Sequence, residues 1–242
     1  MDFFNYRLTK SLDDIEWRQP DCCAIVVDCL NPHSFVTALD DEEFRQALEG
    51  CDYLLPDGEG ICMAMRWIGK KELRKIAGDD LHTHLLKQLD AMHGKAFYMG
   101  SAESTLESIR KRLSVEYPNI TVEVHAPSFS KELPEGESLQ IVEKINSFAP
   151  DVLFVSMSAP KQEKWVEHYR KLLGTTKLIA PIGGVFDFYS GRRKRAGKLM
   201  LRLKLEWLVR LVKEPRRMWR RNLVSAPRYV RYVLRHRKEM CD

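Results

Sequence analysis

The sequence predicts an α/β fold, in which a largely parallel, Rossmann-like sheet is flanked by helices and followed by a basic helical C-terminal appendage. Short β-branched or apolar runs alternate with longer segments of helical period, which is typical of parallel strands joined by helices. The charge then changes sign, because residues 192–242 contain 18 Lys and Arg and only four acids, a net of +14, whereas all 242 residues together carry +5. We therefore expect an α/β domain over residues 1–195 and a basic appendage over residues 196–242.

The expected strands and helices alternate along the chain. Strands are predicted at residues 23–27, 96–99, 120–124, 152–156 and 178–182. Helices are predicted at residues 34–48, 79–92, 104–117, 134–148 and 162–173. Ser34, Asp79 and Ser104 are suited to cap the first three of these helices. No internal repeat or low-complexity linker interrupts the pattern.

The composition excludes several classes of protein. A chain of 242 residues with 44% hydrophobic residues can bury a substantial core. Its six cysteines form no C-x-x-C pair, which disfavours structural zinc and is typical of reduced thiols in a cytoplasmic protein. The first ten residues lack the pattern of a secretory signal, and the apolar stretch at residues 178–186 is far shorter than the roughly 20 residues that a spanning helix needs. If the protein meets a membrane, we expect it to lie on the surface.

Residues that can do chemistry gather in the turns after the predicted strands. These turns are residues 28–32, 100–103, 157–163 and 183–187. Open α/β sheets bind ligands outside the carboxyl ends of their strands, so we expect all four turns at one edge of the sheet.

A carboxylate lies in the turn at residues 55–60, where Asp57 precedes Gly58 and an apolar segment. Asp-Gly is most often only a turn or a helix cap. A carboxylate at a helix entry can also act as a general base that takes the proton from an attacking hydroxyl group. Spacing alone does not separate these two interpretations.

Two further turns carry groups suited to a nucleotide. Gly100 lies between a strand and a helix, where helix N–H groups attract phosphate, although an ordinary turn explains the glycine equally well. After Pro160, the residues Lys161, Gln162 and Glu163 place a cation, an amide and a carboxylate in the first turn of a helix. These groups suit uracil, sugar hydroxyls and a phosphate. The alternative is a capped surface helix with a glutamate in its first turn.

A glycine pair, a carboxylate and a basic run follow one another at residues 183–195. Gly183 and Gly184 permit close approach of a ligand, and the run that contains Arg192 and Arg195 is suited to a diphosphate. In the alternative interpretation, Asp187 is a buried structural acid and the basic run is a solvated face.

No motif requires a metal ion or another cofactor. The sequence has no D-x-D motif at a strand end, no H-E-x-x-H motif and no cluster of Cys and His, so we predict no metal site and no cofactor. Ser156 and Ser158 lack a G-x-S-x-G setting, which does not fit a hydrolase.

Several short blocks occur together in a fixed order. They are Asn31-Pro32, Pro56-Asp57-Gly58, residues 76–81, Met99-Gly100, residues 159–163, Gly183-Gly184 with Phe186-Asp187, Gly191 with Lys194-Arg195-Ala196, and residues 205–208. In this order the blocks, which span residues 25–220, resemble the WecG/TagA/CpsF glycosyltransferase family, also called glycosyltransferase family 26.

The resemblance implies an inverting, metal-independent bacterial transferase that makes cell-surface polysaccharide. Such enzymes are peripheral proteins of the cytoplasmic face of the inner membrane. Members move a sugar, often N-acetylmannosamine or its uronic acid, from a UDP-sugar to a polyprenyl-diphosphate-linked sugar. By similarity, the catalytic base falls on Asp57, the donor-site glutamine on Gln162, and the start of the membrane-docking appendage near Arg195.

Four positions depart from the residues usual in the family: Cys29 replaces Thr, Lys75 replaces Arg, Ser158 replaces Gly, and Gly197 replaces Pro. These departures leave the predicted reaction class unchanged. They leave the identity of the transferred sugar open.

The predicted reaction is a single displacement, in which Asp57 deprotonates the acceptor hydroxyl as it attacks the anomeric carbon. UDP leaves, and protein groups rather than a metal offset the charge of its diphosphate. The residues predicted to bind the substrates are Asn31, Lys75, Asp80, Gly100, Lys161, Gln162, Glu163, Gly183, Gly184, Asp187, Arg192 and Arg195.

The basic appendage is expected to meet an anionic membrane surface. Leu201, Leu205, Leu208 and Val212 recur at helical spacing, which suits either packing on the domain or contact with a membrane. Beyond Pro215, apolar residues interleave with arginines, as in interfacial helices. An exposed apolar face would equally suit a second copy of the chain or an integral membrane protein.

Two other functions share some of these features. A nucleic-acid-binding protein would use the same arginines, but no RNP, KH or zinc-finger pattern is present. A nucleotide-dependent oxidoreductase would share the α/β pattern, but the glycine fingerprint of a dinucleotide site is missing.

Overall fold

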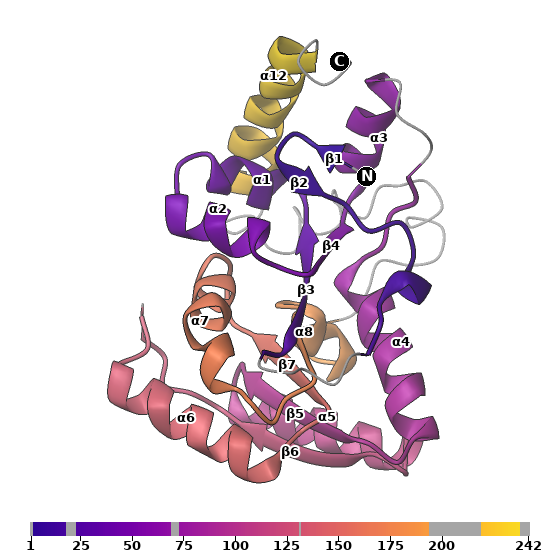
Figure 1. The fold of residues 1–242 in the computed structure, drawn as a ribbon, viewed down its shortest axis with the longest axis vertical. Helices are drawn as coiled ribbons and strands as arrows, with labels where there is room; N and C mark the ends of the chain where they lie inside the picture. Colours follow the sequence, from indigo (N-terminus) through magenta and orange to yellow (C-terminus); the bar gives the residue numbers. More distant parts are fainter. Residues whose placement is uncertain (1, 18–22, 69–72, 131, 194–218, 238–242) are drawn as a thin grey trace.

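The sheet has six parallel strands, in the order β4-β3-β8-β7-β5-β6 (Figure 1). The computed structural model describes residues 2–17, 23–68, 73–130, 132–193 and 219–237. The strands of the sheet are β3 Ile25–Leu30, β4 Tyr53–Pro56, β5 Lys95–Gly100, β6 Thr121–His125, β7 Val152–Ser156 and β8 Leu178–Pro181. The predicted α/β fold with a parallel, Rossmann-like sheet is therefore confirmed.

All five predicted strands are present, and two differences have physical reasons. β3 begins at Ile25 and continues to Leu30, so Asp28 lies inside the strand rather than in the turn after it. The charge of Asp28 made the apolar run look shorter than it is. β4 was not predicted, because it has four residues and ends in Pro56. Proline is tolerated there because β4 lies at the edge of the six-stranded sheet.

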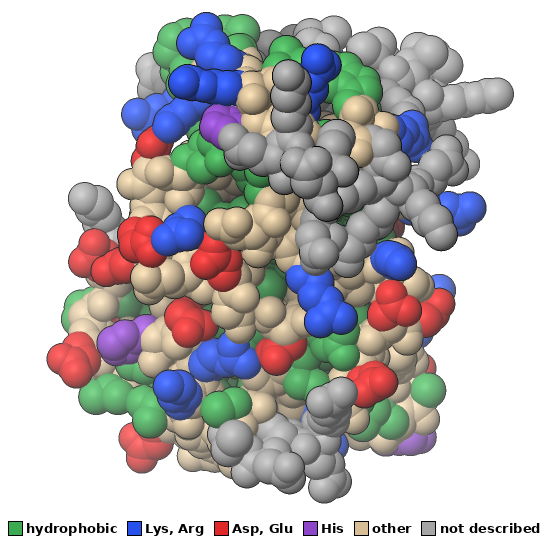
Figure 2. Space-filling view, turned by 45° about the horizontal axis from the view of Figure 1, so that its top comes forward, with side chains coloured by type: hydrophobic (Ala, Val, Ile, Leu, Met, Phe, Trp, Pro, Cys, Tyr) green, Lys and Arg blue, Asp and Glu red, His purple; other side chains and the backbone are tan. Residues whose placement is uncertain are grey.

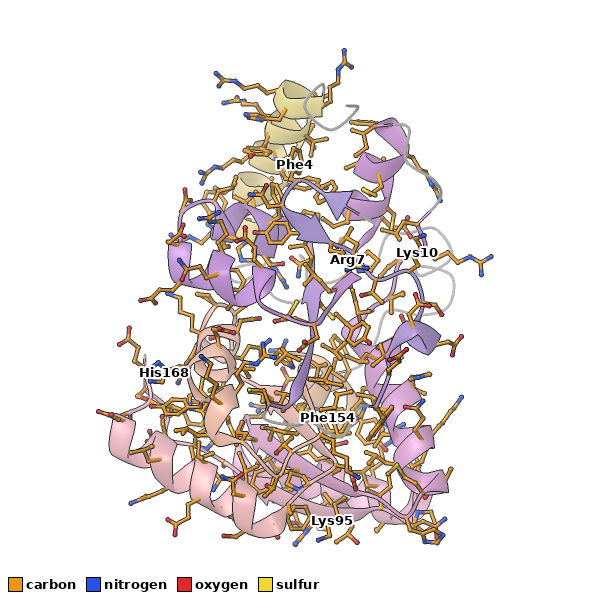
Figure 3. The ribbon with its side chains drawn as sticks, in the orientation of Figure 1. Phe4, Arg7, Lys10, Lys95, Phe154 and His168 are labelled. Carbon is orange, nitrogen blue, oxygen red and sulfur yellow. The ribbon has the colours of Figure 1, made fainter. Side chains whose placement is uncertain are left out.

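Helices cover both faces of the sheet. Those on one face are α4 Gly78–Ala91, α5 Glu103–Glu116 and α8 Val185–Tyr189, and those on the other are α6 Glu135–Phe148 and α7 Lys161–Tyr169. Tyr98 and Phe154 pack in the first layer, and Phe97 and Leu153 pack in the second; Phe154 is labelled in Figure 3. Because successive side chains of a strand alternate between faces, neighbouring residues serve opposite layers.

Four of the predicted helices are confirmed as α4, α5, α6 and α7, the last continued by a 3-10 turn at Arg170–Leu172. The single helix predicted at residues 34–48 is wrong, because the structure has two helices there, α1 Pro32–Ala38 and α2 Glu42–Glu49. Asp41 starts the second helix, since its Oδ1 atom accepts a hydrogen bond from the Phe44 N–H at 3.1 Å.

A third group of elements packs beside the β4 edge of the sheet. It contains α1, α2, α3 Glu59–Trp67, the strand pair β1 Asp2–Phe3 and β2 Tyr6–Arg7, a π-helical turn Arg220–Ser225 and α12 Ala226–His236; a 3-10 turn at Leu12–Asp14 follows the strand pair. Aromatic rings join the two ends of the chain here, since the rings of Phe4 and Tyr232 meet edge to face at a centroid distance of 5.1 Å (Figure 3).

The described part of the basic tail is tied to the domain through one face of α12. Tyr229 is 4% exposed, and its hydroxyl donates to the Gly60 carbonyl oxygen at 3.2 Å. Arg228 forms a two-pronged ion pair with Asp40. This face of α12 therefore belongs to the core of the third group. The predicted amphipathic helix at residues 201–212 lies outside the described residues.

Replacing Tyr229 with Ala is expected to detach α12. The change removes a buried ring that packs on Phe3 and Phe35, which costs about 3 kcal/mol or more. Hydrogen exchange of the α12 amides should accelerate, while exchange in the central sheet stays slow. Val230→Ala, at a 43% exposed position of the same helix, is the matched control. Equal exchange of α12 in the two variants would contradict the assignment of Tyr229 as the anchor.

Candidate active site

Residues predicted to contact substrates are distributed along one edge of the sheet, where the strands end. In sheet order, Asp57 follows β4, Asn31 follows β3, Gly183 lies just beyond β8, Gln162 lies in the helix after β7, and Gly100 ends β5. Neighbouring strands lie about 4.8 Å apart, so the ends of β4 and β5 are separated by about 19 Å. The edge is therefore long enough to hold two different parts of a ligand.

The sheet reverses its winding direction between β5 and β7. The chain leaves β5 toward β6 through α5 on one face, and it leaves β7 toward β8 through α7 on the other. Such a reversal is where open α/β sheets form a ligand crevice, outside the carboxyl ends of the strands. The crevice expected from topology thus lies between the turns that hold Gly100 and Gln162.

At the β4 end, the turn that holds Asp57 lies against the start of α1. The Asp57 N–H donates to the Leu30 carbonyl oxygen at 2.8 Å. Gly58 has a φ of 109°, and a Cβ atom there would lie 3.5 Å from the Pro32 ring. The Asn31 side-chain oxygen caps α1 by accepting two backbone N–H bonds, each at 3.0 Å. Asp57 and Asn31 therefore follow neighbouring strands in adjoining turns.

The thiol of Cys29 lies in a region of negative charge. Burial raises the pKa of Cys29, and the charges of Asp57, Asp28 and Glu163 raise it further. A thiol in such surroundings stays protonated and is a poor nucleophile. Cys29 is therefore disfavoured as the reactive group at this end of the edge, and the role of Asp57 as the base stays a prediction.

Near the centre of the edge, the side-chain amide of Gln162 is held at both ends. Its Oε1 atom accepts from the Met157 N–H at 3.1 Å, and its Nε2 atom donates to Glu163 Oε1 at 2.9 Å. Gly183 has a φ of 48°, and a Cβ atom there would lie 3.4 Å from Oε1 and 3.6 Å from Nε2. The absence of a side chain at Gly183 thus leaves open the space beside the amide.

Two carboxyl groups are buried beneath this edge. Asp28 is 2% exposed and Glu163 is 6% exposed. Burial raises the pKa of both groups, and the charge of Glu163 raises that of Asp28 further. The sequence-based alternative was a capped surface helix with a glutamate in its first turn; Glu163 does lie in the first turn of α7, and its side chain is buried.

At the β5 end, a glycine is required by sterics. Gly100 has a φ of 115°, and a Cβ atom there would lie 2.1 Å from the Ser156 carbonyl oxygen of β7. The Ser101 N–H donates to that same oxygen at 3.0 Å. The predicted role of Gly100 in phosphate binding stays a prediction, and the close approach of β5 to β7 already explains the glycine.

Three predicted cations lie along the same edge. Arg192 reaches the first turn of α5, with its Nη1 atom 3.4 Å from Thr105 Oγ1. Lys161 donates from Nζ to the Ser130 carbonyl oxygen at 2.9 Å. Lys75 is exposed next to Ile76, which is hydrogen-bonded through its N–H to the end of β4. The fourth predicted cation, Arg195, lies outside the described residues.

Two predicted acids take part in local structure. Asp80 accepts from the Ala77 N–H at 2.8 Å and so caps α4. Asp187 forms an ion pair with Arg193, whose Nε atom lies 3.1 Å from the carboxylate. Gly184 lies at the start of α8 and is partly exposed. Substrate contact by Asp80, Asp187 and Gly184 stays a prediction.

Sequence reasoning missed two residues of this edge. The Ser156 hydroxyl donates to the Gly183 carbonyl oxygen at 2.6 Å and so joins the ends of β7 and β8. Asp28 supplies the second buried carboxyl group. A signal for Asp28 was available, since an acid within an apolar, β-branched run is unusual in a central strand.

The described residues give no sign of a metal centre or of a membrane span. Among them, no group of three or more His, Cys, Asp or Glu side chains is placed to hold a metal ion. None of their helices has the length and apolar character to cross a membrane. The described cysteines Cys23, Cys29, Cys51 and Cys62 are free thiols.

Comparison with known proteins gives consistent matches along the whole chain. Residues 2–240 match the profile of the glycosyl transferase WecG/TagA/CpsF family. The chain is 32% identical to the N-acetylglucosaminyldiphosphoundecaprenol N-acetyl-β-D-mannosaminyltransferase of Bacillus spizizenii, over 98% of this chain and 90% of the relative. Proteins of the same name from Bacillus subtilis and Staphylococcus aureus are 31% and 24% identical, over 98% and 99% of this chain and 90% and 92% of the relatives.

Gly100→Ala is expected to destabilise the fold. The new Cβ atom would overlap a backbone oxygen of β7, and the positive φ adds strain, so we expect a loss of about 3 kcal/mol or more in the free energy of unfolding. Urea titration would measure this loss. Gly136→Ala is the matched control, because nothing lies within 4 Å of a Cβ atom at that helical position. A Gly100→Ala protein as stable as the control would show that β5 and β7 do not approach as described.

Proposed function

Because the chain belongs to the glycosyl transferase WecG/TagA/CpsF family, we propose that it moves a sugar from a UDP-sugar to a polyprenyl-diphosphate-linked saccharide. The observation that carries the proposal is the order of groups along the sheet edge: Asp57 and Asn31 at one end, Gln162 beside Gly183 near the centre, and Gly100 at the other. The names of the relatives specify an N-acetylmannosamine-type sugar and an N-acetylglucosamine-diphosphoundecaprenol acceptor. We propose the same classes of donor and acceptor for this chain, in the synthesis of a bacterial cell-surface polysaccharide.

The proposed reaction is a single displacement. The Asp57 carboxylate takes the proton of the acceptor hydroxyl while the hydroxyl oxygen forms a bond to the anomeric carbon of the donor sugar. The bond from that carbon to the UDP oxygen breaks, and UDP leaves with the bonding electrons. Attack from the side opposite the leaving group inverts the configuration at the anomeric carbon. Asp57 ends the step protonated.

The length of the sheet edge supports the binding of different parts of the substrates at its two ends. Asp57 follows β4, about 19 Å from the end of β5, so the base and the Gly100 turn meet different parts of the substrates. We assign the nucleotide to the crevice between β5 and β7, near Gln162, and the acceptor to the Asp57 end. Arg192, at the first turn of α5, is suited to offset the diphosphate charge together with helix N–H groups, without a metal ion.

The outer face of α12 supports attachment to an anionic membrane. Val230 and Leu234 are 43% and 49% exposed on successive turns, and Arg231 and Arg235 stand beside them. Apolar side chains flanked by arginines are typical of helices that lie in a membrane interface. Figure 2 shows Lys and Arg side chains together with apolar ones toward the top of the view, and most acidic side chains below them.

A second element reaches the same end of the molecule (Figure 1). Met63 and Trp67 lie one turn apart on α3 and are 48% and 61% exposed. α3 begins two residues after Asp57 and touches α12 through Gly60 and Tyr229. We propose that α12 and α3 together rest on the cytoplasmic face of the bacterial inner membrane, which brings a lipid-linked acceptor to the Asp57 end of the site.

Asp57→Asn is expected to lower kcat by about 10² to 10⁴, because the amide cannot accept the acceptor proton. Donor binding should remain close to that of the wild-type protein. Turnover with a UDP-sugar and a short-chain lipid-diphosphate acceptor, and UDP binding by calorimetry, measure the two quantities. Glu59→Gln, which neutralises the next carboxylate along the chain, is the matched control. Wild-type turnover in Asp57→Asn would refute the assignment of the base.

Replacing both Val230 and Leu234 with Ser is expected to weaken binding to vesicles that contain phosphatidylglycerol by about tenfold or more, since two apolar side chains no longer enter the interface. Flotation with vesicles measures the effect. Activity on a water-soluble acceptor should not change. Val115→Ser, at an 80% exposed position of α5, is the control for loss of an exposed apolar side chain. Equal flotation of the double variant and the control would contradict the proposed contact.

A further inference from the structure

Burying a carboxyl group lowers the stability of a folded protein. In the part of the chain that the structure describes, the buried carboxyl groups lie at the candidate site. Among the described residues, Asp28 and Glu163 are the buried acids, and neither forms an ion pair with a described Lys, Arg or His. Unpaired acids in an interior usually lower stability, so their presence at a site points to function rather than to folding. Asp28 lies three residues before Asn31, and Glu163 adjoins Gln162.

The contacts of Glu163 lead to one neighbour. Its Oε1 atom accepts the hydrogen bond from Gln162 Nε2 at 2.9 Å, and its enclosed Oε2 atom has no hydrogen-bond partner among the described residues. A side chain that is 6% exposed offers little surface to a ligand. Gln162 is itself 5% exposed, but its amide adjoins the partly exposed Gly183, so the route from Glu163 to a substrate runs through that amide.

The Gln162 amide needs such a partner to keep its orientation. An amide group has an accepting oxygen and a donating nitrogen of nearly the same shape, and a rotation exchanges them. Met157 donates to the oxygen and Glu163 accepts from the nitrogen, so both ends are fixed. The nitrogen has a second hydrogen, and the position that a Cβ atom would take at Gly183 lies 3.6 Å from it.

We propose that Glu163 is a positioning residue, whose buried carboxyl group holds the Gln162 amide with its nitrogen ready to donate to the UDP-sugar in the space beside Gly183. The inference rests on the proposed function. It assigns no contact between Glu163 and the substrate. A carboxyl group can accept the Gln162 hydrogen whether it is ionised or protonated, so the positioning role does not depend on its charge.

The buried surroundings of Glu163 also predict how the stability of the protein depends on pH. Burial raises the pKa of Glu163, and the groups facing the same interior are Asp28, Asp57, Cys29 and Cys51, with Arg170 beside Cys51. An acid with a raised pKa in the folded state binds its proton more tightly there than in the unfolded chain. Its contribution to stability is therefore lost as pH rises from the unfolded pKa of about 4.3 toward the folded one. Replacing Glu163 with a residue that does not ionise should remove this loss of stability at high pH.

Glu163→Ala and Glu163→Gln test the proposal. We expect Glu163→Ala to raise the KM for the UDP-sugar by about tenfold, the value of one buried hydrogen bond, with kcat and the acceptor KM little changed. Glu163→Gln should restore the donor KM, because its side-chain oxygen accepts the same hydrogen bond. At pH 8 the unfolding temperature of Glu163→Gln should equal or exceed that of the wild-type protein, and its advantage should shrink at pH 5. Glu167→Ala, at an exposed position of the same helix, is the matched control.

A double-variant cycle separates positioning from a general effect on the fold. When Gln162→Ala is already present, adding Glu163→Ala should change the donor KM by less than about twofold, because its target is gone. An unchanged donor KM in Glu163→Ala, or equal losses with and without Gln162, would overturn the proposal. The proposal would also be overturned if both Glu163 variants unfolded at a lower temperature than the wild-type protein at pH 8 and their KM values for donor and acceptor rose together. If the wild-type protein transfers no sugar from any UDP-sugar, the proposed function and this inference fail together; if it is active, failure in Glu163→Ala removes the inference alone.

Discussion

The hydrogen bond from the Asp57 N–H to the Leu30 carbonyl oxygen, 2.8 Å long, constrains the part of the molecule where transfer is proposed. It joins the last residue of β3 to the first residue after β4 and so extends their pairing by one hydrogen bond. The next residues, Asn31 and Gly58, must then turn away from the sheet together. Gly60, which follows this turn, can approach Pro32 because it lacks a side chain, since a Cβ atom there would come within 2.7 Å of the Pro32 ring. The starts of α1 and α3 therefore lie against each other.

The arrangement of α1 and α3 also determines where α12 packs. Tyr229 reaches the Gly60 carbonyl, and Ser225 lies 2.8 Å from the His33 ring nitrogen, so the tail spans the starts of α3 and α1. A displacement of α12 would be transmitted to the turns that hold Asp57 and Asn31 through two or three residues. The tail contact and the proposed base therefore form one packed unit, and a membrane bound to α12 would act on the same unit.

Charge at the edge follows from the same burial. A diphosphate brought to the sheet would approach Asp57, Asp28 and Glu163, in a body of residues 1–191 that carries −9 overall. Burial raises the pKa values of Asp28 and Glu163 and so favours their protonated, neutral forms. In the proposed complex this would reduce the repulsion of an anionic substrate, and the positive charges of Arg192 at α5 and of the basic tail would attract it.

Local patterns predicted the layers of the fold but not the features that depend on contacts between distant segments. The apolar runs at β5, β7 and β8 and the helices after them follow from periodicity. β4 did not, because a strand of four residues that ends in Pro56 is defined by its pairing with β3 rather than by its own sequence. The first helical turn predicted for Glu163 is confirmed, but its burial could not be predicted, because acids in first helical turns are common whether or not they are exposed. Gly100 was correctly singled out, but its strongest requirement is the oxygen of Ser156, which is 56 residues away in the chain.

The helix α12 has two apolar stripes, and the domain occupies one of them. Tyr229 and Val233, four residues apart, are 4% and 2% exposed, whereas Val230 and Leu234, displaced from them by one position, remain 43% and 49% exposed. One position in a helix is a rotation of about 100°, so the two stripes are separate faces and cannot both meet the same surface. An apolar face flanked by Arg231 and Arg235 is expected to bind best to a partner with an apolar interior and a negatively charged surface. A lipid leaflet has both properties and a nucleic acid has only the second, so the outer face of α12 supports the proposed contact with a membrane rather than with a nucleic acid.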